Sequence, residues 1–108
     1  MAKNKKLFTS GYLSAKECRH GIFVYNRLDQ YVGRSLDTYG EFSNQEFEIM
    51  KDFASGLVLD VGANIGALTV PLARVAKHVI AIEPQPWVAD VLTANIAINC
   101  LRNVDVIR

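Results

Sequence analysis

The stretch that decides the fold is "VLDVGANIGALTVPLA", residues 58–73. It begins as an apolar run, breaks at Gly62 and Gly66, and resumes with apolar residues at helical spacing. Residues 57–61 are apolar except for Asp60, which predicts a strand covered on both faces. Open α/β sheets bind their ligands at the carboxyl ends of their strands. The glycine turn is therefore a candidate ligand site.

The residues around this turn predict alternating helices and strands. Ser43 and Glu46 form a capping-box pattern before a helical periodicity, and Pro86 suits the first turn of a later helix. The predicted helices cover residues 44–54, 66–76 and 86–98, and two further strands are predicted at 78–82 and 104–107. This alternation indicates βαβ units and a parallel sheet.

The upstream region predicts a β-hairpin. Residues 22–26 and 31–36 are strand-like runs on either side of a mostly polar turn, residues 27–30. The expected fold class is α/β: a partial Rossmann-like parallel sheet of about three strands with flanking helices, preceded by a β-hairpin and a helix. We expect an N-terminal segment over residues 1–42 and the parallel sheet within residues 43–108.

The spacing of the glycines separates two classes of nucleotide ligand. A dinucleotide-binding fingerprint is GxGxxG with its first glycine directly after the strand, whereas Asp60 holds that place here and three residues separate Gly62 from Gly66. A carboxylate at this position repels a pyrophosphate and attracts a positively charged ligand. Glu83 ends the next strand, where a carboxylate can accept two hydrogen bonds from a ribose diol. A ribose and a cation together indicate S-adenosylmethionine.

Several separated motifs occur in the order found in one enzyme family. "DVGANIG", "TVPLA", "VIAIEPQP" and "NIAINCLRNV" resemble the first two motifs of class I methyltransferases, specifically the FkbM-type family. The upstream "RHGIFVYNRLDQYVGRSLDTYGEF" is similar to the hairpin that precedes them in that family. The resemblance implies S-adenosylmethionine as cofactor and transfer of its methyl group, usually to an oxygen of a sugar or another small metabolite.

The resemblance also assigns roles to single positions. Asp60, Gly62, Asn64 and Gly66 match the family's cofactor loop, and Glu83 matches the acid that holds the ribose hydroxyls. Each residue also has a purely structural interpretation. In it, the glycines are required only by the turn, the asparagine caps the following helix, and the glutamate interacts favourably with the positive end of the next helix dipole. The family's acceptor-binding and catalytic groups follow the last residue of this chain, so the catalytic residues are unknown.

The predicted function is therefore S-adenosylmethionine-dependent methyl transfer of FkbM type, present here as the cofactor-binding N-terminal half of a truncated domain. One alternative is a non-catalytic cofactor-binding or interaction module. A less favoured one is a fragment of an NAD-dependent oxidoreductase, which fits Glu83 but not the glycine spacing. An unpaired edge on the central strand predicts self-association or a complementing polypeptide, and no methyl transfer by the chain alone.

The amino-acid composition predicts which partners the protein has and where in the cell it is found. Half of the 108 residues are hydrophobic and the formal net charge is +1, typical of a soluble globular protein without a nucleic-acid footprint. Lys3, Lys5 and Lys6 are expected to be a solvated terminus. No apolar run reaches the roughly 18 residues of a membrane span, and no signal peptide is visible. We expect a cytoplasmic protein with a small-molecule acceptor and neither nucleic acid nor membrane as partner.

Few other side chains suggest chemistry. Cys18 and Cys100 lie in no CxxC motif and have no histidine at metal-ligand spacing, so we expect two reduced, buried thiols, no disulfide and no metal site. His20 and His78 are expected to be structural or surface residues rather than catalytic bases. Tyr39 and Glu41 either line the cofactor pocket or pack a tight turn.

Overall fold

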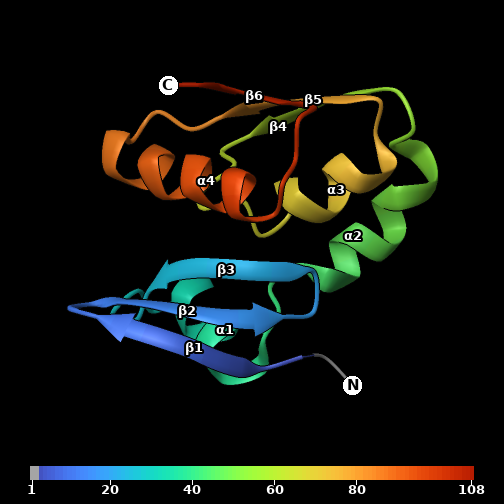
Figure 1. Cartoon of the computed structure of the whole chain (residues 1–108). Coiled ribbons are helices and arrows are strands. Elements are labelled where there is room, and N and C mark those ends of the chain that lie inside the picture. Colours follow the sequence, from blue (N-terminus) through green and yellow to red (C-terminus); the bar gives the residue numbers. More distant parts are fainter. Residues whose placement is uncertain (1–2) are drawn as a thin grey trace.

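The structure is a computed structural model that describes residues 3–108, and these form two three-stranded sheets (Figure 1). The first sheet is antiparallel, in the order β1 (Lys5–Ser10), β2 (Leu13–Cys18) and β3 (Gly21–Asn26). The second is parallel, in the order β4 (Leu57–Val61), β5 (His78–Ile82) and β6 (Val104–Ile107). The helices are α1 (Val32–Tyr39), α2 (Asn44–Met50), α3 (Thr69–Val75) and α4 (Pro86–Ile98), and a 3-10 turn, Lys51–Phe53, follows α2.

The parallel sheet and its helices confirm the predicted α/β class. β4, β5, α4 and β6 have the predicted bounds. The register runs from Leu57 opposite His78 to Val61 opposite Ile82, so β4 and β5 end at the same edge of the sheet. The turn after β4 therefore lies beside the turn after β5, as a site shared by both strands requires.

Helix α3 begins at Thr69 and not at residue 66. The cause is the backbone of the preceding turn, in which Gly62, Asn64 and Gly66 all have positive φ angles. A right-handed helix cannot include residues in the left-handed region. The helix therefore starts only after this turn, and Pro71 falls in its first turn, where a missing N–H is tolerated.

The predicted hairpin is wrong in its second strand. β3 pairs with β2, while residues 31–36 belong mostly to α1. Val32 and Leu36 are both buried, and their spacing of four residues is that of a helix face. The Asp29 carboxylate accepts a hydrogen bond from the Gly33 N–H at 2.7 Å, so the polar turn starts a helix.

The helix predicted over residues 44–54 is present as α2 and the 3-10 turn, but the predicted capping box is wrong. Ser43 has a φ of 58° and makes no side-chain hydrogen bond to the helix. The apolar side chains of this segment are also largely uncovered, since Ile49 is 70% and Phe53 86% exposed. The spacing of apolar residues therefore predicted the position of this helix correctly, although these side chains are not buried against the rest of the protein.

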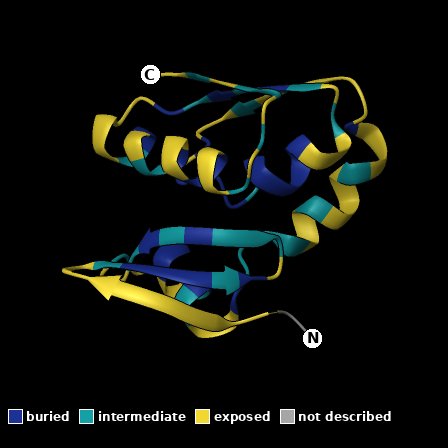
Figure 2. Cartoon of the chain, in the orientation of Figure 1, coloured by how far each residue is buried: buried dark blue, intermediate teal, exposed yellow. Residues whose placement is uncertain are grey.

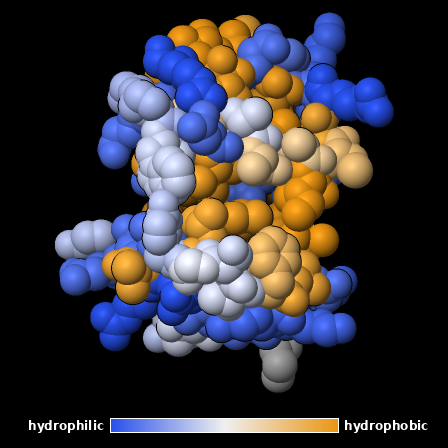
Figure 3. Space-filling model, turned by 60° about the vertical axis from the view of Figure 1, so that its left-hand side comes forward, coloured by the Kyte–Doolittle hydropathy of each residue, from blue (hydrophilic) through white to orange (hydrophobic). Residues whose placement is uncertain are grey.

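One face of the parallel sheet is open. α3 and α4 cover the other face, where Val79 and Ala81 are fully buried (Figures 1 and 2). Leu57, Leu59 and Val61 point away from these helices and are 61% to 75% exposed. Figure 3 shows apolar side chains gathered at the top of the molecule, where this sheet lies. The prediction of a strand covered on both faces is therefore wrong for β4 in this chain.

One buried cluster joins the N-terminal sheet to the start of α3, and a second joins the parallel sheet to α4. α3 and α4 lie between β3 and the parallel sheet (Figure 1). Phe23 and Tyr25 of β3 belong to the same buried cluster as Ile65 and Val70, which precede and follow the start of α3. Burial raises the pKa of the Tyr25 hydroxyl, and its hydrogen bond to the Asp37 carboxylate raises it further. The N-terminal sheet is thus packed against the helices of the parallel sheet.

The two cysteines are free thiols, and each histidine lies within hydrogen-bond distance of a side-chain oxygen. Burial raises the pKa of the Cys18 thiol to about 11, whereas Cys100 is exposed, so the prediction that both are buried is wrong for the second. His20 Nε2 lies 2.7 Å from Asn44 Oδ1, and His78 Nε2 lies 2.9 Å from an Asp105 carboxylate oxygen. Within residues 3–108 the structure contains no group of side chains that could hold a metal ion, and no helix with the length and apolar character of a membrane span.

Candidate functional site

The turn between β4 and α3 folds back on itself at the edge where the parallel strands end. Gly62, Asn64 and Gly66 have φ angles of 75°, 55° and 96°. The two glycines differ in their surroundings, because a Cβ at Gly66 would lie 2.9 Å from Leu92 Cδ1 while one at Gly62 would meet no atom within 4 Å. The absence of a side chain at Gly66 therefore allows the turn to pack against Leu92, whereas Gly62 borders open space.

The backbone N–H groups of residues 62–66 all have acceptors within the protein. The acceptors are Ile82 O for Gly62 (2.9 Å) and Ala63 (3.0 Å), the Glu83 carboxylate for Asn64 (2.9 Å), the Asn64 side chain for Ile65 (2.9 Å) and Ala63 O for Gly66 (3.1 Å). Glycine-rich loops that bind phosphate do so with free N–H groups that point at the ligand. This turn has no such donor free between its two glycines.

Glu83 connects the turn after β4 to the turn after β5. It is buried, with one carboxylate oxygen accepting the Asn64 N–H at 2.9 Å and the other accepting the Gln85 N–H at 3.1 Å. A carboxylate has about four acceptor positions, so these two bonds leave capacity for two more. Glu83 therefore shapes the site and retains the capacity to accept hydrogen bonds from a ligand.

Asp60 is held by the start of α3. Its carboxylate accepts a hydrogen bond from the Thr69 hydroxyl at 2.5 Å, and Thr69 is fully buried. Sequence reasoning missed Thr69, whose signal is a polar residue at the start of an apolar helical run. Asn64, in contrast, does not cap α3 as one interpretation predicted, because its side chain accepts the N–H of Ile65 inside the turn.

A pocket of about 190 Å³ lies against the turn. Asp60, Gly62 and Asn64 line it, together with Val32 and Phe42 from the N-terminal part of the chain. A second pocket of about 200 Å³ shares Val32 and Asn64 with it and extends to the start of α4. The structure thus brings three of the predicted site residues to one surface, where residues from both parts of the chain meet.

Gly66 and Glu83, the other two residues predicted to bind the cofactor, do not line this pocket. Gly66 packs on Leu92, and Glu83 reaches the turn through the Asn64 N–H. Tyr39 is 67% exposed, and Glu41 pairs with Arg19 at 3.5 Å. These two residues line a different hollow, beside α2.

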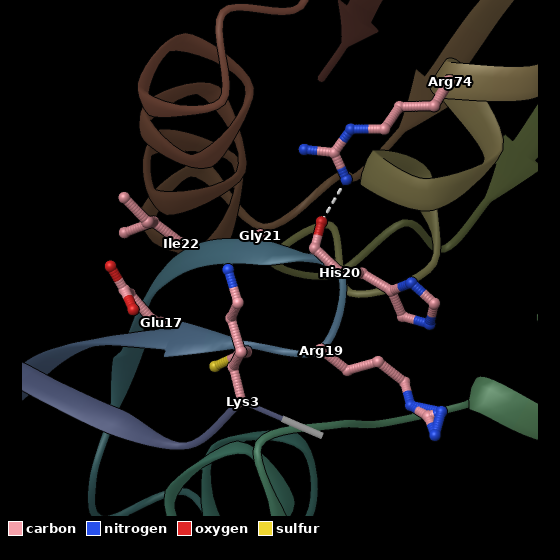
Figure 4. Close-up of a pocket in the computed structure, with 8 residues that line it drawn as sticks. Lys3, Glu17, Arg19, His20, Gly21, Ile22 and Arg74 are labelled. Atoms are coloured by element: carbon pink, nitrogen blue, oxygen red, sulfur yellow. Dashed lines mark hydrogen bonds between the residues drawn. The ribbon is translucent and has the colours of Figure 1, made fainter. Parts of the chain in front are cut away.

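A larger hollow of about 340 Å³ contains none of the predicted site residues (Figure 4). It is lined by basic side chains, including Lys3, Arg19 and Arg74, with Glu17 among them. Arg74 donates a hydrogen bond to the backbone oxygen of His20, drawn as a dashed line in Figure 4. This contact fixes the turn between β2 and β3 against α3.

Known methyltransferases resemble this chain in sequence and in structure. The probable ribosomal RNA small subunit methyltransferase A of Methanosphaera stadtmanae is 45% identical over 51 residues, which are 47% of this chain and 19% of that protein. M. jannaschii TYW2 in complex with AdoMet is similar over 94% of this chain and 45% of that one, with a TM-score of 0.69 and 27% identity. The complex of aTrm5 and tRNALeu gives a TM-score of 0.70 at 20% identity, over 94% of this chain and 29% of that one. No family model matches the chain.

These comparisons contradict the prediction that nucleic acid is not a partner. The relative that is 45% identical is named as a methyltransferase of ribosomal RNA. The prediction used the formal net charge of the whole chain, a sum that says nothing of charges gathered on one surface. The chain spans less than half the length of these proteins, and the structural likeness includes both of its sheets. The chain therefore has the class I S-adenosylmethionine-dependent methyltransferase fold, over the part of that fold that contains the first βαβ units.

Proposed function

We propose that this chain is the cofactor-binding part of an S-adenosylmethionine-dependent methyltransferase. Residues 43–108 supply the turn that carries the site, and residues 1–42 form the N-terminal segment, whose Val32 and Phe42 also line the pocket. Asp60, Gly62 and Asn64 line the cofactor surface, and Gly66 packs the turn against Leu92. Glu83 holds the shape of the turn and keeps acceptor positions for the ligand. The observation that carries this proposal is the turn of residues 62–66, whose N–H groups are all engaged and whose neighbouring side chains are carboxylates.

The residues present fit this cofactor better than they fit a dinucleotide. S-adenosylmethionine has an ammonium, a sulfonium, one carboxylate and a ribose diol, and it has no phosphate. Because its cationic groups outnumber its single carboxylate, it requires hydrogen-bond acceptors and negative charge more than a pyrophosphate does. Asp60 lines the pocket, and Glu83 has unused acceptor positions next to Asn64. A dinucleotide, in contrast, would bring its pyrophosphate to a turn without free donors and with a carboxylate beside it.

The chemistry that this cofactor supplies is a methyl group on a positively charged sulfur. The chain's own contribution is to bind and orient the donor, because an in-line displacement gains most of its rate from the alignment of the two reactants. Asp60 and Glu83 supply charge and hydrogen bonds for that orientation. No residue of this chain is assigned as a general base.

RNA is the methyl acceptor that we favour. Support comes from the relative named as a ribosomal RNA methyltransferase and from the likeness to a tRNA complex. A hydroxyl of a sugar or another small metabolite is the second candidate, supported by the resemblance of "DVGANIG" and "VIAIEPQP" to FkbM-type enzymes. Both candidates use the same donor site and differ in what the rest of the enzyme presents to it.

The test of the proposal is a change at Glu83. Glu83→Gln keeps the shape of the side chain and removes its charge and one acceptor oxygen. If the carboxylate accepts hydrogen bonds from the ribose diol, losing one charge-assisted bond of about 1.5–3 kcal/mol weakens binding roughly 10- to 150-fold. Calorimetry should show this loss for S-adenosylhomocysteine and little loss for its 2′,3′-dideoxy analogue, which lacks the hydroxyls.

The matched control is Asp90→Asn, which removes a carboxylate from the exposed side of α4, where it pairs with Arg108. We expect no change in affinity for either ligand. Equal losses for both ligands in Glu83→Gln would mean that Glu83 only shapes the turn. An unchanged dissociation constant for S-adenosylhomocysteine would remove it from the site altogether.

A further inference from the structure

Asn95 of α4 and Asn99, the C-cap residue that directly follows α4, form a polar interface with the N-terminal sheet. They are four residues apart, so they lie one above the other on the same face of the helix. Asn95 is fully buried. A buried amide is costly unless its polar atoms are paired, so its partners show what holds it there.

Each asparagine pairs with one residue of β3 through both ends of its amide. The Asn99 side chain accepts the Ile22 N–H at 3.0 Å and donates to the Ile22 oxygen at 2.8 Å. The Asn95 side chain accepts the Val24 N–H at 2.8 Å and donates to the Val24 oxygen at 3.0 Å. The rise of about 6 Å over four helical residues nearly matches the roughly 6.6 Å between alternate strand residues, so the two spacings fit.

These amides take the place of a neighbouring strand. β3 is the last strand of its sheet and pairs with β2 on its other side. The outward N–H and oxygen groups of an edge strand are otherwise left for water or for another chain. Asn95 and Asn99 satisfy these groups on two alternate residues, and so they fix both the position and the register of the N-terminal sheet on α4.

Asn95 makes one contact that Asn99 does not. Its Nδ2 also donates to the Ile65 oxygen at 2.8 Å. The further bonds of Asn99 are a donation to the Asn95 oxygen at 2.8 Å and an acceptance from Arg74 Nη2 at 3.4 Å. Ile65 directly follows Asn64, the left-handed residue whose N–H is bound by Glu83. One side-chain amide therefore joins β3, α4 and the turn that lines the pocket.

We propose that Asn95 is a positioning residue for the cofactor turn, which couples the docking of the N-terminal sheet to the shape of that turn. The inference rests on the proposed function in one respect, that the turn binds a cofactor. The coupling itself is a property of the ligand-free protein. When the amide of Asn95 loses its donor, the Ile65 oxygen is left buried without its partner, and the turn opens more often.

The test is Asn95→Asp with Asn99→Asp as its matched control. Both changes replace an amide nitrogen by an oxygen and remove a donation to a β3 oxygen. Only the first removes the bond to the Ile65 oxygen. The added charge is fully buried at position 95 and lies beside Arg74 at position 99, so Asn95→Ser and Asn99→Ser repeat the comparison without a charge. Native-state hydrogen exchange of the full chain, measured by NMR without ligand, should show faster exchange at Ile22 or Val24 in both variants. It should show at least about tenfold faster exchange at Asn64 and Gly66 in Asn95→Asp alone, the scale expected for one lost buried hydrogen bond.

Affinity for S-adenosylhomocysteine provides the second readout, and we expect it to fall in the Asn95 variant and to be unchanged in the Asn99 variant. Exchange at Asn64 that is the same in both variants would overturn the inference. If Asn95→Asp does not fold, Asn95→Ser permits the same comparison with a smaller, uncharged side chain. A wild-type chain that fails to bind S-adenosylhomocysteine would overturn the proposed function, while the exchange comparison would still decide the coupling.

Discussion

Gly66→Val is expected to cost this protein a large part of its stability. The φ of 96° is strained for any residue with a Cβ, and that Cβ would lie 2.9 Å from Leu92 Cδ1, an atom of a fully buried side chain. Backbone strain costs about 1–3 kcal/mol, and overpacking a core adds about 1–3 kcal/mol. Together these costs are about 2–6 kcal/mol, a large part of the stability of a small domain, about 5–15 kcal/mol. Urea unfolding followed by circular dichroism measures the change.

Gly56→Ala is the control for this experiment. A Cβ at Gly56 would meet no atom within 4 Å, and its φ is not in the left-handed region. We expect a change within about 0.5 kcal/mol, as for most surface substitutions. A Gly66→Val variant that unfolds at the same urea concentration as the wild-type chain would contradict the packing described for this turn.

Gly62→Val is expected to have the opposite profile, with the fold kept and binding lost. A Cβ here would meet no protein atom within 4 Å, so the folded protein bears only the strain of a φ of 75°, about 1–2 kcal/mol. The same open space borders the pocket, and a branched side chain would occupy it. We expect affinity for S-adenosylhomocysteine to fall by about 100-fold or more, a free-energy loss of about 2.8 kcal/mol.

Circular dichroism and calorimetry together decide this case. A folded Gly62→Val variant with the affinity of the wild-type chain would mean that Gly62 serves the turn alone. A variant that does not fold would show that the space beside Gly62 is needed by the protein itself.

Local patterns in the sequence predicted the second half of the chain well. β4, β5 and β6 were predictable because each is a short apolar run, and α4 was predictable because Pro86 marks its start. The start of α3 was not predictable from periodicity, because the left-handed residues of the preceding turn, Asn64 and Gly66, decide it.

The N-terminal part shows where local patterns fail. Residues 31–36 have enough β-branched and aromatic character for a strand, and the helix forms because Val32 and Leu36 are buried together in the cluster that also contains Phe23. The pairing of Asn95 with Val24 joins residues 71 positions apart, and no spacing along the chain indicates it. The sequence indicated the ligand class of the site, while the contacts that support the site come from the tertiary structure.

The central claim is that the turn of residues 62–66 belongs to a methyl-donor site and not to a dinucleotide site. Parallel calorimetric titrations of the wild-type chain with S-adenosylhomocysteine and with NAD test it directly. Because the N–H groups of this turn are all engaged and Asp60 lies beside them, we expect saturable binding of S-adenosylhomocysteine and no binding of NAD. Binding of NAD without binding of S-adenosylhomocysteine would contradict the account.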